Sequence, residues 1–142
     1  MEIEVYGMLV QGDKAFLRQT ESGLSLIGGP ANWIEPDIKI DLDQFLFDLA
    51  LRKITRYFKR IGIDIRGIDR RFAIPPSIFE DTILLGYAIP TVLINGKIDL
   101  KKSGLTSLPI DDLISGQLND QLVKEGYLGE LIHLIAHKYK IS

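Results

Sequence analysis

The segment that decides the fold runs from Ser25 to Ile63 and reads SLIGGPANWIEPDIKIDLDQFLFDLALRKITRYFKRIGI. A short apolar strand end leads into Gly28-Gly29-Pro30, and a loop that carries Trp33 and Glu35 follows. From residue 46 to residue 61, apolar side chains recur at steps of three and four. This spacing predicts one long amphipathic helix that packs on the rest of the chain.

The ends of this helix are marked by residues that suit helix termini. Asp41 or Asp43 is a good N-cap, because its carboxylate can accept from the free amides of the first turn. Lys59 and Arg60 suit the negative end of the helix dipole, and Gly62 predicts the end of the helix.

Strands are expected on both sides of this segment. Residues 2–10 and 15–18 predict a hairpin, and 24–27 predicts a third strand. The apolar run Thr82–Ile94 contains Pro90, which predicts either two strands or an edge strand with a bulge. Asn95-Gly96 predicts a type I′ hairpin whose second strand is 97–100.

The C-terminal part of the chain closes with helical patterns. Residues 101–107 are expected as a loop, 109–113 as a short helical turn, and a last helix is expected from Asn119 onward. Strands, a helix, more strands and a closing helix predict an α/β sandwich. The 142 residues are about the length of one domain, so residues 1–142 are expected to form a single domain.

The composition narrows the class of protein. Apolar residues make up 46% of the chain, enough for a substantial core, and no apolar run approaches the ~18 residues of a membrane span. The chain has no cysteine, which excludes disulfides, thiolate zinc sites and cysteine nucleophiles. Acidic residues near the N-terminus do not fit a signal peptide. We therefore expect a cytoplasmic protein, and the composition is compatible with a thermophilic source.

A net charge of −2 conceals a basic belt at residues 52–71. The belt contains eight lysines and arginines and two acids, Asp64 and Asp69, so its net charge is +6. The remaining residues therefore carry a net charge of −8. Such a belt predicts either an anion-binding surface or a solvated face whose charges pair with acids elsewhere.

The order of these features resembles the Nudix box, the signature of hydrolases that act on nucleoside diphosphates linked to another group. Gly29 and Glu35 have the five-residue gap of the box, Arg52-Lys53-Ile54 resembles its arginine and apolar positions, and Gly62-Ile63 resembles its closing pair. The gap from Glu35 to Arg52 is nine residues longer than in the family. Two further segments are similar to the family's opening hairpin and to the part that precedes its last helix: 5–18 and 108–113.

The resemblance implies a Nudix-like α/β/α sandwich with a mixed central sheet and two main helices. It also places basic residues where the family has three metal-binding glutamates. Counted from Arg52, the three positions are Lys53, Arg56 and Tyr57; counted back from Gly62, they are Arg56, Lys59 and Arg60. The sequence has no carboxylate between Asp48 and Asp64.

Lysine and arginine cannot ligate magnesium, which requires hard oxygen ligands. The resemblance therefore implies a non-catalytic Nudix-like domain without a metal or other cofactor. Arg52, Arg56 and Lys59 are the expected phosphate-binding residues, because arginine can hold a phosphate with two parallel hydrogen bonds. The expected partner is a nucleotide, an RNA or another protein.

Two other functions stay open at this point. One is a divergent phosphohydrolase of nucleoside diphosphate derivatives, with Glu35 as the catalytic residue. Acids from flanking loops (Asp37, Asp41, Glu80 and Asp81) would then rebuild a magnesium site. The other is a structural homodimer, in which an apolar edge at Leu84–Ile94 pairs with a second copy.

Two aromatic residues are candidates for stacking on a base, namely Trp33 and Tyr57. For Trp33 we favour the alternative that it covers the core beneath the long loop. Glu130, His133 and His137 fall at steps of three and four near the C-terminus, and we expect an exposed group rather than a metal site there.

Overall fold

The computed structural model describes residues 1–36 and 39–142. Its main sheet has the strand order β3-β2-β1-β7-β6, with β4 also paired to β1 and β9 also paired to β2. The strands are β1 (Glu2–Gln11), β2 (Lys14–Thr20), β3 (Gly23–Ser25), β4 (Ile27–Pro30), β6 (Ser77–Phe79), β7 (Thr82–Pro90) and β9 (Leu105–Pro109).

The sheet is mixed, as the resemblance implies. β1 and β7 run parallel over their whole length, from the pair Glu2–Thr82 to the pair Val10–Pro90. The other pairings in this sheet are antiparallel, including β4 on β1 and β9 on β2. β1 therefore holds the centre, with β7 on one edge and both β2 and β4 on the other.

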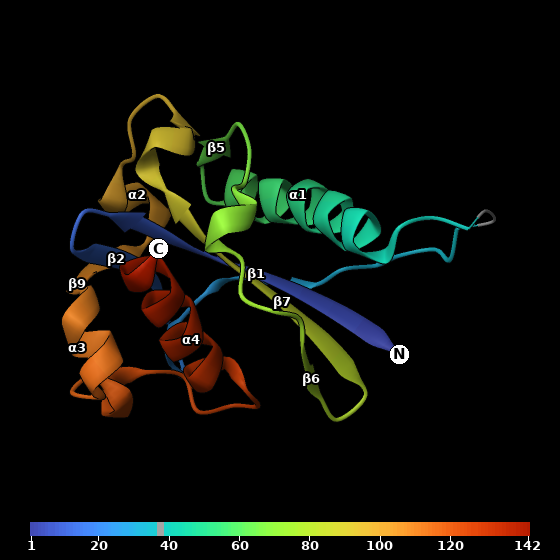
Figure 1. The fold of residues 1–142 in the computed structure, drawn as a ribbon. Helices are drawn as coiled ribbons and strands as arrows, with labels where there is room; N and C mark the ends of the chain where they lie inside the picture. The colour runs from blue at the N-terminus through green and yellow to red at the C-terminus, as the bar shows by residue number, and fades with distance from the viewer. Residues whose placement is uncertain (37–38) are drawn as a thin grey trace.

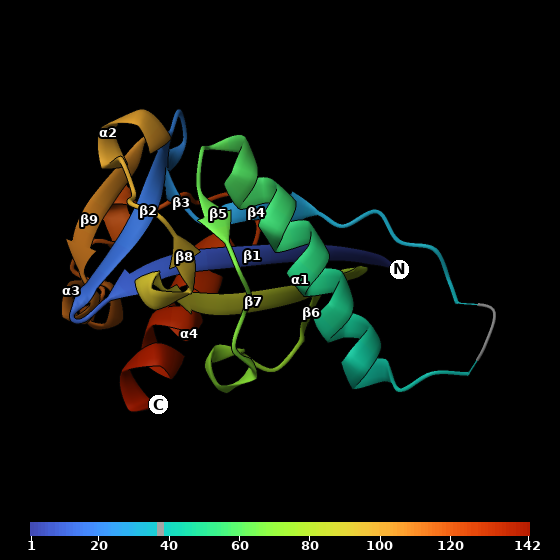
Figure 2. The same ribbon diagram turned by 90° about the horizontal axis from the view of Figure 1, so that it is seen from above.

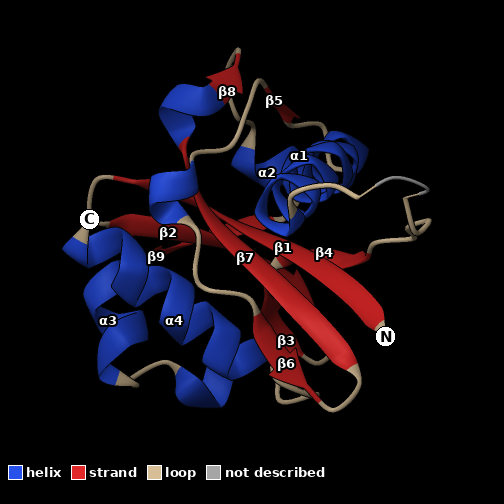
Figure 3. Cartoon of the chain, turned by 45° about the vertical axis from the view of Figure 1, so that its right-hand side comes forward, coloured by secondary structure: helices blue, strands red, loops and turns tan. Residues whose placement is uncertain are grey.

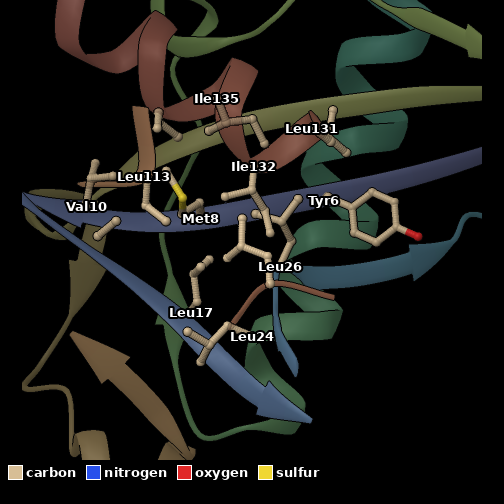
Figure 4. Packing of buried hydrophobic residues seen from close by; sticks show 14 of the residues in the cluster. Tyr6, Met8, Val10, Leu17, Leu24, Leu26, Leu113, Leu131, Ile132 and Ile135 are labelled. Atoms are coloured by element: carbon tan, nitrogen blue, oxygen red, sulfur yellow. The ribbon is translucent and has the colours of Figure 1, made fainter. Parts of the chain in front are cut away.

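Helices cover both faces of this sheet, which makes the three-layered sandwich visible in Figure 1 and Figure 3. α1 (Leu42–Arg60) packs on one face, and α3 (Ile110–Ser115) and α4 (Leu128–Ile141) pack on the other. β1 divides its side chains between the two resulting cores, because neighbouring residues of a strand point to opposite faces. The α4 side, shown in Figure 4, takes Tyr6, Met8 and Val10, and the α1 side takes Ile3, Val5 and Leu9.

α1 has the ends that the sequence predicts. Asp41 is the N-cap, and its side chain accepts a hydrogen bond of 3.2 Å from the Gln44 amide. The helix ends before Gly62, which has a φ of +82°. Its buried face is made of Leu46, Leu49, Ala50, Ile54 and Phe58.

Smaller elements fill the ends of the sandwich. A two-stranded sheet pairs β5 (Asp64–Ile65) with β8 (Ile94–Asn95), and α2 (Leu100–Ser103) precedes β9. Short 3-10 helices are found at η1 (Arg70–Phe72), η2 (Thr91–Leu93) and η3 (Asn119–Gln121).

The apolar run Thr82–Ile94 is not a sheet edge, so the edge proposed for a homodimer is wrong. β7 lies between β1 and β6, and Ile74 and Ala73 add contacts along its second side. Residues 84–89 are buried by helices on both faces, which explains why the run is apolar. The structure therefore removes the argument for pairing through this strand.

Two other local predictions are also wrong. Asn95-Gly96 does not make a hairpin, because β8 pairs with β5 instead and Asp99 caps α2. The last helix begins at Leu128 rather than at Asn119, because Gly126 adopts a φ of +58° and interrupts the chain before it. Among the described residues, no helix is both long and apolar enough to cross a membrane.

Candidate functional site

β4 passes very close to its neighbours, and its two glycines make this possible. A Cβ atom on Gly28 would lie 2.0 Å from the carbonyl oxygen of Val5 in β1. A Cβ atom on Gly29 would lie 2.8 Å from the hydroxyl of Tyr57 in α1. The Gly-Gly pair therefore lets β4 fit between the central strand and the C-terminal half of α1.

Tyr57 fixes the helix to this strand. Its hydroxyl donates a hydrogen bond of 2.7 Å to the carbonyl oxygen of Pro30, and the guanidinium of Arg60 lies 4.9 Å from the centre of its ring. A second tyrosine lies nearby on β1, where the Tyr6 hydroxyl donates to Glu4 at 2.5 Å. Burial, followed by the Glu4 hydrogen bond, raises the pKa of Tyr6 far above its ordinary value.

A stripe of three cations runs along α1 beside Tyr57. Lys53 and Arg60 are four and three residues from Tyr57, so they share its side of the helix. Arg56 lies between them in the sequence, three residues after Lys53 and four before Arg60. The side chain of Lys53 has a lowered pKa, first because of desolvation and then because of the charges of Arg56 and Arg52. We call Lys53, Arg56 and Arg60 the basic stripe.

The basic stripe only partly coincides with the phosphate-binding residues predicted from the sequence. Arg52, Arg56 and Lys59 are all exposed on α1. Arg52 and Lys59 are five and two residues from Tyr57, so neither shares the side of the helix that Tyr57 occupies. Within residues 1–36 and 39–142, no carboxylate lies within 4.0 Å of these three cations. The cations that share the side of Tyr57, which contacts β4, are instead Lys53 and Arg60. Counting back from Gly62 in the sequence already gave Arg60 as one of the three positions.

The C-terminal part of the basic belt is engaged within the fold. Arg70 lies 3.9 Å from the ring centre of Phe47 and donates to the side chain of Gln44 at 2.8 Å. Arg71 pairs with Asp69 at 3.0 Å, and Arg66 donates to the carbonyl of Val92 at 2.6 Å. These three arginines hold loops together, so the belt divides into a structural part and the cations of α1.

The two candidate stacking residues lie at opposite ends of α1. Trp33 packs edge-to-face on Phe45 with 5.8 Å between ring centres, and it remains 36% exposed. Phe45 and Tyr57 are twelve residues apart, which is ~18 Å along a helix. One base therefore cannot stack on both Trp33 and Tyr57. Trp33 borders a hollow of about 500 Å³ that is also lined by Met1, Ile3, Leu42, Phe45, Leu46 and Ile83.

The residues do not fit the magnesium that the Nudix resemblance implies. Arg56, Lys59 and Arg60 offer no oxygen ligand at the helix positions. In the described part of the chain, no three acidic or histidine side chains form a group that could hold a metal, and this includes Glu130, His133 and His137. Glu35 lies exposed in the loop before α1, and Glu80 and Asp81 form the turn between β6 and β7. Asp37 is outside the described residues.

Comparisons with known proteins agree with this architecture. Neither a protein-family model nor a curated protein matches the sequence. The structure is similar to that of an ADP-ribose pyrophosphatase from Streptococcus suis, with a TM-score of 0.56 and 15% identity over 98% of this chain and 92% of that chain. It is also similar to a MutT protein from Bacillus halodurans, with a TM-score of 0.56 and 13% identity over 96% and 83% of the two chains.

The chain has a Nudix-like fold. Both similar structures are Nudix hydrolases, and the match extends over almost the whole chain. At this level of identity the likeness shows the fold alone. The Nudix-like fold thus places the basic stripe on the helix that, in the family pattern, carries the metal-binding glutamates.

Proposed function

We propose that this Nudix-like domain binds the phosphate groups of a nucleotide on the basic stripe, without metal-dependent hydrolysis. The observation that carries the proposal is the stripe itself, in which Lys53, Arg56 and Arg60 lie three and four residues apart along α1, with Arg60 over the ring of Tyr57, whose hydroxyl is hydrogen-bonded to β4. In a Nudix hydrolase this helix holds carboxylates that bind metal. Cations at the same place bind phosphate directly and repel a metal ion.

The charge of the stripe supports this proposal. Lys53 loses its proton more readily than an isolated lysine because it is partly desolvated and faces Arg56 and Arg52. A bound phosphate would offset that repulsion and stabilise the charged form of Lys53. Hydrogen bonds to charged groups contribute about 1.5–3 kcal/mol each, so three of them at the upper end of this range reach the ~8 kcal/mol of micromolar binding.

Calorimetric titration with ADP tests the proposal. At low salt we expect micromolar affinity for the wild-type protein and about tenfold weaker binding for Arg56→Gln. Arg71→Gln is the matched control, because Arg71 is equally exposed but pairs with Asp69. Wild-type protein that gives no heat with ADP, or an Arg56→Gln variant that binds like wild type, would contradict the proposal.

The second candidate is a phosphohydrolase of nucleoside diphosphate derivatives. The comparisons favour it over the first candidate, because one similar structure is named an ADP-ribose pyrophosphatase and both are hydrolases of this fold. Glu35 is its proposed catalytic residue, from the position that resembles the glutamate of the Nudix box. No metal site for it is seen in the described part of the chain.

A turnover assay with ADP-ribose in the presence of Mg²⁺ or Mn²⁺ separates the two candidates. Release of AMP by the wild-type protein, abolished in Glu35→Gln, would establish the enzyme. Binding of ADP-ribose with no product after prolonged incubation would support the non-hydrolytic domain. Glu21→Gln is the matched control, since Glu21 is an exposed acid in the turn between β2 and β3 and is not among the acids proposed for the metal site.

A further inference from the structure

The end of α1 lies against α2, and this contact joins two groups of cations that are far apart in the sequence. The hydroxyl of Ser103 donates a hydrogen bond of 2.9 Å to the carbonyl oxygen of Ile61, and Ser103 is 5% exposed. Lys59 and Arg60 immediately precede Ile61. Figures 1 and 2 both show α2 at the end of the molecule where α1 finishes.

α2 brings its own cations to this place. Lys101 and Lys102 immediately precede Ser103 and are exposed, as are Lys59 and Arg60. Within the described ranges, these four cations have no carboxylate within 4.0 Å. Two acids in this part of the molecule are already engaged: Asp99 accepts from the Lys102 amide at 3.1 Å, and Asp64 accepts from Asn95 at 3.2 Å.

The resulting surface is longer than a nucleoside diphosphate requires. Lys53 and Arg60 are seven residues apart, or ~10 Å along the helix, and the lysines of α2 extend the surface beyond the helix end. The two adjacent phosphates of a diphosphate can contact the basic stripe, but they are too short to contact the stripe and the lysines of α2 together. A chain of regularly spaced phosphates can, and its affinity comes from the release of the counterions that surround it.

We propose that the basic stripe and the lysines of α2 together bind the phosphate backbone of a single-stranded polynucleotide. This inference rests on the proposed phosphate-binding function of the stripe and identifies its ligand class. The cations form one track from α1 onto α2, which fits one strand. The stripe holds one part of the backbone, and Lys101 and Lys102 hold the phosphates that follow.

Fluorescence anisotropy with a labelled single-stranded RNA of twelve nucleotides tests the proposal, with calorimetric titration of ADP in parallel. The Lys101→Gln/Lys102→Gln double variant is expected to bind the RNA about 20-fold more weakly at ~0.1 M salt, because it loses two phosphate contacts. The slope of log affinity against log salt should fall by about 1.4. Its affinity for ADP should stay at the wild-type value.

The matched control is Lys14→Gln/Lys124→Gln, which removes two exposed lysines from β2 and from the loop before α4. It should retain the wild-type affinity and salt slope, and thermal melts followed by circular dichroism should show both variants folded. Wild-type protein that binds ADP but not the RNA overturns this inference and leaves the proposed function standing. Equal loss in the two double variants, or no loss in the α2 variant, also overturns it. If neither ligand binds, the proposed function itself fails.

Discussion

The hydroxyl of Tyr57 donates a hydrogen bond of 2.7 Å to the carbonyl oxygen of Pro30, and this contact joins α1 to the end of β4. Gly29 provides the room for it, because a Cβ atom there would lie 2.8 Å from the same hydroxyl. This contact therefore helps to set the position of the basic stripe relative to the sheet, together with the buried face of α1.

Removal of the hydroxyl should weaken this attachment. For Tyr57→Phe we expect a loss of about 1 kcal/mol in the free energy of unfolding, the usual contribution of one hydrogen bond. Urea denaturation followed by circular dichroism measures it. Tyr139→Phe is a suitable control, since the Tyr139 ring packs at a tilt against Phe72 and no side-chain hydrogen bond is seen for it among the described residues. Equal loss in both variants would contradict the assigned role.

Gly28 should be intolerant of any side chain. Gly28→Ala would bring a methyl group to within 2.0 Å of the Val5 carbonyl oxygen, so the β1–β4 pairing must shift. We expect destabilisation of about 3 kcal/mol, at the upper end of the usual cost of overpacking. Gly67→Ala is the matched control, because nothing lies within 4 Å of a Cβ atom at that position. A Gly28→Ala protein as stable as Gly67→Ala would show that β4 is not held so closely.

Arg70 should contribute to stability and not to ligand binding. Its guanidinium lies over Phe47 and donates to Gln44, so Arg70→Ala should lower the free energy of unfolding by about 1 kcal/mol. The affinity for ADP should be unchanged, because Arg70 is not part of the basic stripe. Denaturation and calorimetric titration of the same preparation measure both. A large loss of ADP affinity in Arg70→Ala would show that the division of the basic belt is wrong.

Alkaline pH should destabilise the domain through Tyr6. Burial and the hydrogen bond to Glu4 raise the pKa of Tyr6, so the folded protein holds this proton more tightly than the unfolded chain. The resulting stability is complete below the ordinary tyrosine pKa of about 10 and is lost as the pH rises above it. Urea midpoints at a series of pH values should fall less steeply above pH ~10 in Tyr6→Phe. An identical fall in both proteins would contradict this assignment.

Magnesium should not strengthen ADP binding to the basic stripe. Free Mg²⁺ neutralises part of the charge of ADP, and the stripe offers no ligand for the ion. We therefore expect the affinity measured by calorimetry to stay constant or to fall when Mg²⁺ is added at millimolar concentration. A rise in affinity that Glu35→Gln removes would instead support a metal site and the hydrolase.

The sequence pattern predicted the parts of the fold that local chemistry determines. The apolar spacing and Asp41 identified α1 and its start. The strand predicted at 24–27 stopped short, because Gly28 and Gly29 belong to β4 and pair with β1. The resemblance to the Nudix box predicted the three layers and the mixed sheet. The division of the basic belt depends on partners such as Phe47 and Val92, which only the folded chain reveals.

The errors arose where distant contacts override local signals. Asn95-Gly96 has the sequence of a hairpin, but Asn95 belongs to β8, whose partner β5 lies thirty residues earlier in the chain. β9 was expected as a loop because its exposed Thr106 and Ser107 hide the pattern of a strand, and its pairing with β2 determines its conformation. The contact of Ser103 with Ile61, which unites the cations of α1 and α2, has no local signal at all.

The parallel pairing of β1 with β7 has a consequence for how this chain reaches its native state. Glu2 and Thr82 are about 80 positions apart, so β1 leaves the ribosome long before its neighbour β7 is synthesised. Pairings this distant in sequence carry a high loop-closure cost and slow folding. Until then, the apolar residues that β1 contributes to both layers are exposed, and the nascent chain is open to aggregation or to capture by a chaperone.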